Sequence, residues 1–512
     1  MMLQLVDIAN QIRELLEPLK DVLLDIVPAS WLMSLPALTL VLFAILALIV
    51  GMRYNPLGLS FVGVLLAALE MIILNPLDSE IAAITGGVSF GQFARDPMAD
   101  LFIYIILIVG FLVLMSSTLY GGDKGPYNFM LLISFAGAIW VVMATDLVGL
   151  FLAWELMSTP TYILVALGPG REAIDGATKY FVMGLLATMM MVFGIAIIYG
   201  VTGQTNLVEV ATYVDGVWTG STPNAAYTIL LAVVLFIVSF GFKVGVFPGW
   251  QWVPDAYASA DGSVTAYLAG GSKKTGVGAL MRILVVGFVI AQTQWTVVIV
   301  GVAILTMIIG NVLALAQRDI MRMLAYSSVA MMGYLFIGLA SAMNPVDVPS
   351  TTAYTLGVGA ALFMAFTHAI MKTPAFILVW VLSIALSKRI TYDDLAGLSK
   401  RAPLAAGLFT ILMLSLAGMP LTVGFYSKLL LFLSAAAAGM WWLALIGLLN
   451  SVFSLGYYLR VIRYAYMEKA TDDTSIKLPT VPLVAVVLCV IAVIGLFFAP
   501  WIILDYAYAA VP

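Results

Sequence analysis

The sequence predicts an all-α integral membrane protein with about fourteen transmembrane helices. Of its 512 residues, 63% are hydrophobic and only 10% are charged, whereas soluble domains carry roughly 25% charged residues. The mean hydropathy is +1.09. Apolar segments of about 20 residues, long enough to span a hydrocarbon core of about 30 Å, recur along the whole chain. The net charge of −4 says little about partners, because the bilayer covers most of the surface.

Glycine, proline and charged residues divide the chain into fourteen apolar segments. These segments are 31–51, 57–75, 98–120, 126–145, 147–167, 174–200, 226–254, 262–290, 295–316, 322–341, 351–386, 404–436, 439–466 and 479–508. The seventh, eleventh and twelfth are too long for one straight crossing. The seventh contains Pro248 and Pro254, the eleventh contains Pro374, and the twelfth contains Gly418 and Pro420. Because proline removes a helical hydrogen bond, we expect a kink or a break in each.

The distribution of basic residues tests the helix count independently. Fourteen Lys and Arg residues fall in the odd-numbered loops, and one, Arg95, falls in the even-numbered loops. Cytoplasmic loops carry an excess of Lys and Arg, so we expect the odd-numbered loops, which follow the odd-numbered helices, to be cytoplasmic. With fourteen helices, both termini then lie on the outer face. The odd-loop residues are Arg53, Lys124, Arg171, Lys179, Arg318, Arg322, Lys388, Arg389, Lys400, Arg401, Arg460, Arg463, Lys469 and Lys477.

The first 30 residues form a distinct amino-terminal segment. They contain five acidic residues and no basic region ahead of an apolar core, so no signal peptide is evident. Leu3, Val6, Leu15, Leu19 and Val22 fall near helical spacing. We therefore expect an amphipathic, interfacial helix over residues 1–30.

Charged residues inside the apolar segments are the main pointers to function. They are Glu155, Lys243, Lys273, Lys274, Arg282, Lys372 and Lys428. A charge at mid-bilayer costs from about 3 to well over 10 kcal/mol. Such residues are retained mostly where ions or protons move, or where a buried pair locks helices together. The pattern therefore favours a proton path through helices 5, 7, 8, 11 and 12.

Several of these charges also have purely structural interpretations. Glu155 and Lys243 pair with each other or take turns being charged, and such a pair can be architectural. Lys273 and Lys274 are adjacent, so they point about 100° apart and only one faces a given path. Lys274 and Arg282 can snorkel to the interface. His368 and Lys372 share one helical face, although a lone histidine is often simply packed.

Cofactor chemistry is not expected in this chain. One Cys and one His (His368) cannot supply a usual zinc or iron–sulfur ligand set. No glycine-rich dinucleotide or phosphate loop stands between a strand and a helix. We therefore predict no metal site and no cofactor-binding residues, and assign any redox cofactor to another chain.

Four stretches resemble the antiporter-like subunits of respiratory complex I. They are FLAWELMS around Glu155, FKVGVFPGWQWVPDAYASADGSVTAYLAGGSK (242–273), RDIMRMLAYSSVAMMGYLFIGL (318–339) and DLAGLSKRAPLAAGLFTILMLSLAGMPLTVGFYSK (394–428). The similarity runs from about residue 100 to 465. The AYSS sequence and the lysine that ends GFYSK are typical of subunit N of the NADH-quinone oxidoreductase, F420H2 dehydrogenase and photosynthetic versions.

The resemblance implies a specific architecture and a proton path. It implies fourteen helices, broken helices 7 and 12, and two inverted five-helix repeats. The resulting regions are an interfacial segment (1–30), helices 1–3 (31–120), the repeats (121–290 and 291–468), and helix 14 with the carboxy terminus (469–512). The family's proton-carrying residues correspond to Glu155, Lys243, Lys273 and Lys428; His368 and Lys372 are added candidates.

The same resemblance implies the protein's surroundings. The partners are membrane subunits of the L and M type and small membrane subunits, within a lipid bilayer and without nucleic acid. Flavin, iron–sulfur clusters and a quinone-type acceptor belong to partner subunits. The location is the cytoplasmic membrane, or the thylakoid membrane for a photosynthetic version.

The sequence also departs from the family pattern. Trp250 replaces a histidine, Ala258 a glutamate, and Asp261-Gly262-Ser263 a Pro-Thr-Pro turn, while THAIMK (367–372) is more similar to subunit L. Two alternatives therefore stay open. One is a subunit of a cation/proton antiporter or of a membrane-bound hydrogenase complex, and the other is a membrane scaffold that pumps nothing.

Overall fold

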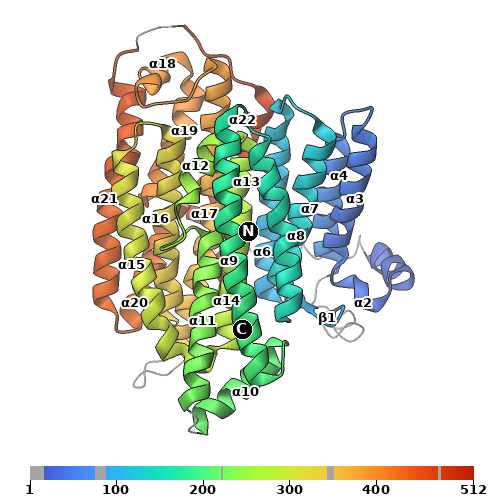
Figure 1. The fold of residues 1–512 in the computed structure, drawn as a ribbon. Coiled ribbons are helices and arrows are strands. Elements are labelled where there is room, and N and C mark those ends of the chain that lie inside the picture. The colour runs from blue at the N-terminus through green and yellow to red at the C-terminus, as the bar shows by residue number, and fades with distance from the viewer. Residues whose placement is uncertain (1–16, 75–87, 221–222, 343–350, 471–473, 512) are drawn as a thin grey trace.

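The computed structural model describes residues 17–74, 88–220, 223–342, 351–470 and 474–511, which form a bundle of long, roughly parallel helices (Figure 1). Within these residues, ten helices are long and apolar enough to cross a membrane. They are α6 (Pro97–Ser116), α7 (Lys124–Met143), α8 (Leu147–Ala166), α9 (Arg171–Thr202), α11 (Pro223–Val244), α15 (Gln292–Ala316), α16 (Ile320–Ser341), α17 (Thr351–Leu386), α21 (Trp441–Met467) and α22 (Thr480–Phe498).

Four further apolar helices are shorter. They are α3 (Leu35–Gly51), α4 (Leu57–Ile73), α19 (Pro403–Ala417) and α20 (Val423–Ala437). The prediction of a mostly helical membrane protein is therefore confirmed. Fourteen crossings remain a prediction, because ten helices meet the length requirement and α19 and α20 are two parts of one predicted segment.

Several membrane helices begin at an aspartate. The side chains of Asp96, Asp146 and Asp319 accept hydrogen bonds from backbone N–H groups in the first turns of α6, α8 and α16. This satisfies donors that have no carbonyl partner within the helix. The carboxylates thus fix where the helices start, and they lie outside the apolar segments, as the bilayer requires.

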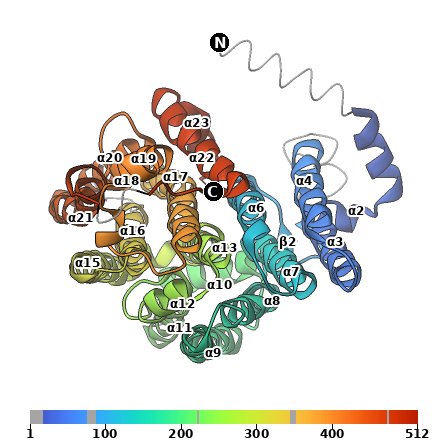
Figure 2. The same cartoon turned by 90° about the horizontal axis from the view of Figure 1, so that it is seen from above.

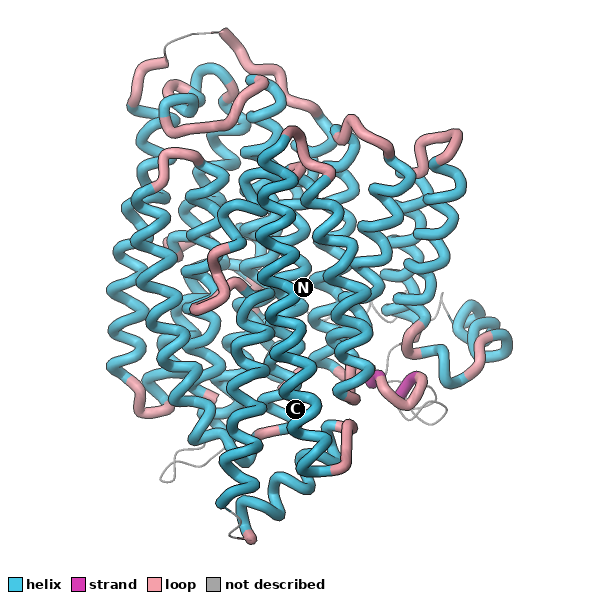
Figure 3. The backbone as a smooth tube through the Cα atoms, in the orientation of Figure 1, coloured by secondary structure: helices cyan, strands magenta, loops and turns pink. Residues whose placement is uncertain are grey.

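The predicted seventh and twelfth helices are both broken. The seventh consists of α11, which ends at Val244, and α12 (Trp252–Ser259). In the twelfth, α19 ends at Ala417 and α20 begins at Val423. Each break starts with a glycine in the left-handed region, Gly245 at φ +70° and Gly418 at φ +85°. Figure 3 accordingly shows loops within the bundle as well as at its ends.

Three other predicted segments differ from the expectation. α17 continues through Pro374 without a break, because it is packed against α6, α13, α16, α20 and α22, which hold it in place. The fourteenth segment is two helices, α22 and α23 (Trp501–Ala509), since Pro500 follows the first of them. The eighth is irregular: α13 (Gly262–Tyr267), the π-helical η2 (Leu268–Ser272), α14 (Lys273–Arg282) and the π-helical η3 (Ile283–Gly287).

Some elements were not predicted. A short antiparallel hairpin, β1 (Val88–Ser89) and β2 (Phe93–Ala94), stands before α6, so the described residues are not purely α-helical. The amphipathic α10 (Leu207–Thr219) buries Leu207, Val210 and Val214. The remaining short elements are α2 (Ala29–Leu32), η1 (Ser117–Leu119), η4 (Val289–Ala291), η5 (Asp393–Leu395) and α18 (Leu398–Arg401).

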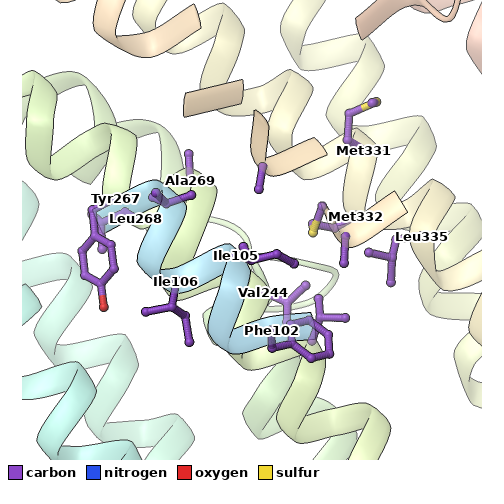
Figure 4. Packing of buried hydrophobic residues seen from close by; sticks show 14 of the residues in the cluster. Phe102, Ile105, Ile106, Val244, Tyr267, Leu268, Ala269, Met331, Met332 and Leu335 are labelled. Carbon is purple, nitrogen blue, oxygen red and sulfur yellow. The ribbon is translucent and has the colours of Figure 1, made fainter. Parts of the chain in front are cut away.

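The core is continuous through the bundle. Figure 2 looks along the helices and shows α3 and α4 at one edge and α15 and α21 at the opposite edge. Figure 4 shows part of the apolar cluster, in which Phe102 of α6, Val244 of α11 and Met332 of α16 are all buried. The intramembrane charges must therefore find their polar partners within this apolar packing.

Only part of the amino-terminal segment can be compared with the prediction. Residues 17–26 are helical and Leu19 and Val22 are exposed, whereas Leu3, Val6 and Leu15 lie outside the described residues. Figure 2 shows the described part beside α2, at the rim of the bundle. The interfacial position stays a prediction.

Candidate functional site: a chain of intramembrane charges

Glu155 lies in the middle of α8 and faces α9. Its Oε1 accepts a hydrogen bond from Thr188 Oγ1 of α9 at 2.8 Å, and its Oε2 accepts one from Thr159 Oγ1 at 3.4 Å. Among the described residues no basic side chain forms an ion pair with Glu155. Hydroxyl groups, rather than a cation, therefore solvate this half-buried carboxylate.

Lys243 sits at the end of α11 in a pocket of aromatic rings and hydroxyls. Its Nζ donates to Tyr180 Oη at 2.6 Å and to Thr161 Oγ1 at 3.3 Å. The two oxygens are 3.0 Å apart, and the ammonium lies 5.7 Å from the ring centroid of Tyr162. In the structure Tyr180 and Thr161, and not Glu155, are the direct partners of Lys243.

Lys273 lies against the break between α11 and α12. Its Nζ is only 3.1 Å from the point where a Cβ on Gly245 would stand. The ammonium donates to Ser328 Oγ of α16 at 3.2 Å and lies 5.6 Å from the ring centroid of Tyr257. The π-helical turn η2 directly precedes Lys273, and such turns are frequent at functional sites.

Lys274 points elsewhere. Its Nζ donates to the carbonyl of Ala269 in its own helical segment at 2.9 Å. Both lysines are buried, so Lys274 is not a snorkelling residue. Of the two, only Lys273 reaches a hydroxyl on another helix.

His368 and Lys372 occupy one face of α17 and are fully buried. Lys372 Nζ donates a short hydrogen bond to Ser327 Oγ of α16, and it lies 5.7 Å from the ring centroid of Phe376. Neither ring nitrogen of His368 has a hydrogen-bond partner among the described residues.

Lys428 lies against the second break. Its Nζ donates to the carbonyl of Ala417, the last residue of α19, and to Ser451 Oγ of α21, both at 2.9 Å. The ammonium is 5.0 Å from the ring centroid of Tyr334. A Cβ on Gly418 would stand 2.8 Å from Lys428 Cδ. Both broken helices therefore place a left-handed glycine directly against a buried lysine.

These six residues lie within a region that matches a known family. Residues 144–454, more than half of the chain, match the family model described as "NADH:quinone oxidoreductase/Mrp antiporter, TM". The chain belongs to this family. The match includes all six candidate site residues, both breaks and the residues that provide their hydrogen-bond partners.

Curated relatives in the family extend the similarity to nearly the whole chain. The F420H2 dehydrogenase subunit N of Methanosarcina mazei is 34% identical over 489 residues, which cover 91% of this chain and 96% of the relative. The NADH-quinone oxidoreductase subunit N of Trichlorobacter lovleyi is 36% identical over 453 residues, 86% of this chain and 89% of the relative.

A solved structure has a similar fold over most of its length. A chain of the respiratory complex I of Thermus thermophilus, determined with bound aureothin, superposes with a TM-score of 0.74. It is 25% identical, and the superposition covers 93% of this chain and 100% of that chain. The resemblance to antiporter-like subunits is thus confirmed.

Three of the positions that depart from the family pattern make close contacts to neighbouring helices. Asp261 caps α13, accepting from Ser263 N at 3.1 Å, and it also accepts from Tyr127 Oη at 3.3 Å. Gly262 packs so closely on Trp380 that a Cβ would stand 2.0 Å from its ring. Trp250 contacts Tyr326, with ring centroids 5.9 Å apart. These contacts connect the segment after the first break to neighbouring helices.

Arg282 is not part of the charge chain. Its guanidinium donates to Asp96 Oδ1 at 2.8 Å and to the carbonyl of Val142 at 2.9 Å. It therefore ties α14 to the ends of α6 and α7 as a structural ion pair. Arg95, the single basic residue assigned to the even-numbered loops, is likewise buried, and it pairs with Asp100.

A second group of charges joins the helix ends on the side of the odd-numbered loops. Asp255 of α12 accepts from Lys179 of α9 at 2.6 Å and from Arg322 of α16 at 2.8 Å. In the loop after α17, burial raises the pKa of Asp394, but hydrogen bonds from Lys388 and Thr391 outweigh burial and hold that pKa below its usual value. These pairs anchor loops and helix ends.

The polar partners of the lysines were missed in the sequence. Tyr180, Ser327, Ser328 and Ser451 are small or aromatic residues in apolar helices, and such residues are common in membrane helices. The only available signal was the AYSS motif. Where the structure describes the chain, no group of three or more His, Cys, Asp or Glu residues could hold a metal ion.

Proposed function

We propose that this chain is the proton-translocating membrane subunit of a complex I-like, redox-driven pump. Protons move through Glu155, Lys243, Lys273 and Lys428, with His368 and Lys372 contributing, and electron transfer to a quinone-type acceptor in other subunits drives them. One observation carries the proposal. Within the described residues, hydroxyls, carbonyls and aromatic rings surround the ammonium groups of these four lysines, and no carboxylate lies within ion-pair distance of them.

This arrangement suits proton transfer better than helix locking. A buried ion pair needs both charges, so loss of a proton from one partner leaves the other charge uncompensated, at a cost of about 3–5 kcal/mol. A lysine bound by a hydroxyl has an uncharged partner whose oxygen accepts a hydrogen bond from the ammonium and from the neutral amine alike. The lysines can therefore release and regain a proton without leaving an unpaired charge behind.

The architecture proposed for this function has fourteen helices and two inverted repeats, over 121–290 and 291–468, preceded by residues 1–30 and 31–120 and followed by 469–512. The corresponding breaks at Gly245 and Gly418 support the repeats, because each repeat then contains one broken helix with one lysine against its break. The excess of basic residues in the odd-numbered loops supports placing both termini on the outer face.

The surroundings follow from the same proposal. The subunit works in the cytoplasmic membrane, or in a thylakoid membrane in a photosynthetic version, beside membrane subunits of the L and M type and small membrane subunits. Flavin, iron–sulfur clusters and the quinone-type acceptor are assigned to partners. The names of the curated relatives, both subunit N of a dehydrogenase or oxidoreductase, support this assignment.

One alternative has direct support. The description of the family model also names the Mrp antiporter. In this alternative, the intramembrane charges of this chain carry out cation/proton exchange. The alternative predicts Na⁺ or K⁺ exchange without redox activity. Copurification of donor-driven quinone reduction with the chain favours the redox pump.

The test replaces Lys243 in the intact complex. In Lys243→Arg the charge stays but no proton is released, because the guanidinium remains protonated at all accessible pH values. We expect the number of protons that membrane vesicles move per electron to fall in both Lys243→Arg and Lys243→Ala. If the chain is a scaffold that needs only a positive charge at this position, the number of protons moved per electron stays unchanged in Lys243→Arg. An unchanged ratio in both assembled variants would overturn the proposal.

The first break gives a second prediction. In Gly245→Ala, the new Cβ stands 2.7 Å from Val253 Cγ2 and 3.1 Å from Lys273 Nζ, so Lys273 must move and the proton-to-electron ratio falls. Gly203→Ala is the matched control, since Gly203 has φ +69° and no atom within 4 Å of its Cβ position. Equal ratios in the two variants would mean that the position of Lys273 is unimportant.

A further inference from the structure

Two adjacent serines on α16 lie between lysines that belong to different repeats. Ser327 and Ser328 are both fully buried. Neighbouring side chains on a helix point about 100° apart, so the two hydroxyls face different helices. Ser328 Oγ accepts from Lys273 of α14 at 3.2 Å, and Ser327 Oγ accepts a short hydrogen bond from Lys372 of α17.

We propose that this serine pair is the junction through which a proton passes from the first repeat to the second, with Ser328 as the relay hydroxyl and Ser327 as a positioning residue for Lys372. The inference rests on the proposed function and adds the residues that connect its two halves. Lys273 lies in 121–290 and Lys372 in 291–468, and α16 is the helix that contacts both.

The two hydroxyls differ in what they can do. Ser327 Oγ donates its hydrogen to the carbonyl of Leu324 at 3.0 Å, so it can only accept from Lys372 and holds that ammonium in place. Ser328 Oγ accepts from Lys273, and it donates to no acceptor among the described residues. A hydroxyl that accepts on one side and keeps its own hydrogen free can pass a proton onward.

The neighbouring groups do not offer this route. Lys274 donates to the carbonyl of Ala269, and a carbonyl oxygen cannot pass a proton on. His368 makes no hydrogen bond to the described residues through either ring nitrogen. Hydroxyls from one helix therefore provide the direct polar contacts to Lys273 and Lys372.

The transfer step balances in atoms and charge. The ammonium of Lys273 gives one proton to Ser328 Oγ, while the original hydroxyl hydrogen of Ser328 leaves to a bridging water. That water gives a proton to the neutral amine of Lys372. One N–H bond of Lys273 is broken, one N–H bond of Lys372 is formed, and Ser328 ends as a hydroxyl. The positive charge has moved from the first repeat to the second.

The experiment removes the relay hydroxyl in the assembled complex. In Ser328→Ala we expect donor-driven proton output from vesicles to fall by about tenfold or more, in line with the roughly 100-fold or larger contribution of a positioned proton-transfer group. Ser328→Thr keeps a hydroxyl and restores most of the output. Ser341→Ala is the matched control, because Ser341 is also fully buried on α16 but donates to Ile337 O of its own helix at 2.6 Å.

Each outcome decides the proposal. A loss in Ser328→Ala with recovery in Ser328→Thr and no change in Ser341→Ala supports the relay. Normal output in Ser328→Ala, together with a loss in Lys243→Arg, overturns the relay and leaves the proposed function standing. No loss in any of these variants means that the proposed function itself fails. If Ser328→Ala does not assemble, the comparison of Ser328→Thr with Ser328→Val decides, since these differ mainly in the hydroxyl.

Discussion

Gly418→Ala is expected to abolish proton output through the second broken helix while the complex still assembles. The new Cβ stands 2.8 Å from Lys428 Cδ and 3.6 Å from its Nζ. The lysine must leave its position, and the hydrogen bonds to Ala417 O and Ser451 Oγ are lost with it. Proton output per electron in vesicles measures the effect.

Backbone strain is separated from displacement of the lysine by a control in the same region. A left-handed backbone conformation costs a residue with a Cβ roughly 1–2 kcal/mol, and Gly418 has φ +85°. Gly439 follows α20, has φ +75°, and has no atom within 4 Å of its Cβ position. Gly439→Ala should therefore destabilise the subunit by a similar amount and leave proton output unchanged. Loss of output in both variants would assign the effect to strain alone.

The membrane helices were predictable because bilayer thickness constrains each of them locally. A run of apolar residues long enough to cross the bilayer can be recognised without knowledge of any contact. The two breaks were also predictable, the first from Pro248 and the second from Gly418 with Pro420, since glycine and proline act on their own backbone. Gly245, at which the first break starts, was not singled out in the sequence. Pro374 shows the limit of local reasoning, because α17 is surrounded by other helices and continues through it.

The charged residues of the site were predictable, but their partners were not. A lysine in an apolar segment is conspicuous, whereas the hydroxyl that solvates it is not. Tyr180 is 63 residues from Lys243, and Ser328 is 55 residues from Lys273. Such partners depend on how distant helices pack. The direct Glu155–Lys243 pair was one expectation from the sequence, and the structure instead has Thr188 on Glu155 and Tyr180 on Lys243.

The arginine at the start of α6 carries the largest stability prediction. Arg95 Nε lies 2.5 Å from Asp100 Oδ1, and its Nη2 donates to the carbonyl of Met71 at 2.8 Å. Its Nη1 also donates to the carbonyl of Leu74. Arg95 thus binds the unpaired carbonyls at the end of α4 and a carboxylate of α6. Arg95 is 2% exposed and Asp100 4%, so water cannot replace a lost partner.

Arg95→Ala is expected to destabilise the chain by about 3–5 kcal/mol, because Asp100 then remains as an uncompensated buried charge. The readouts are a lower apparent melting temperature in detergent and less assembled complex in the membrane. The double variant Arg95→Met with Asp100→Leu removes both charges and should recover most of the loss, since apolar residues of similar volume often replace a buried pair without cost.

An exposed ion pair provides the comparison for this variant. Arg463 pairs with Glu468 at 2.9 Å, but their side chains are 66% and 38% exposed. Surface ion pairs contribute about 0–1 kcal/mol to stability. The apparent melting temperature of Arg463→Ala should therefore be close to that of the unmodified protein. If the apparent melting temperature of Arg95→Ala is also close to that of the unmodified protein, the Arg95–Asp100 pair does not hold α4 and α6 together. If the double variant is as unstable as Arg95→Ala, the loss comes from the carbonyls of Met71 and Leu74 and not from the charge of Asp100.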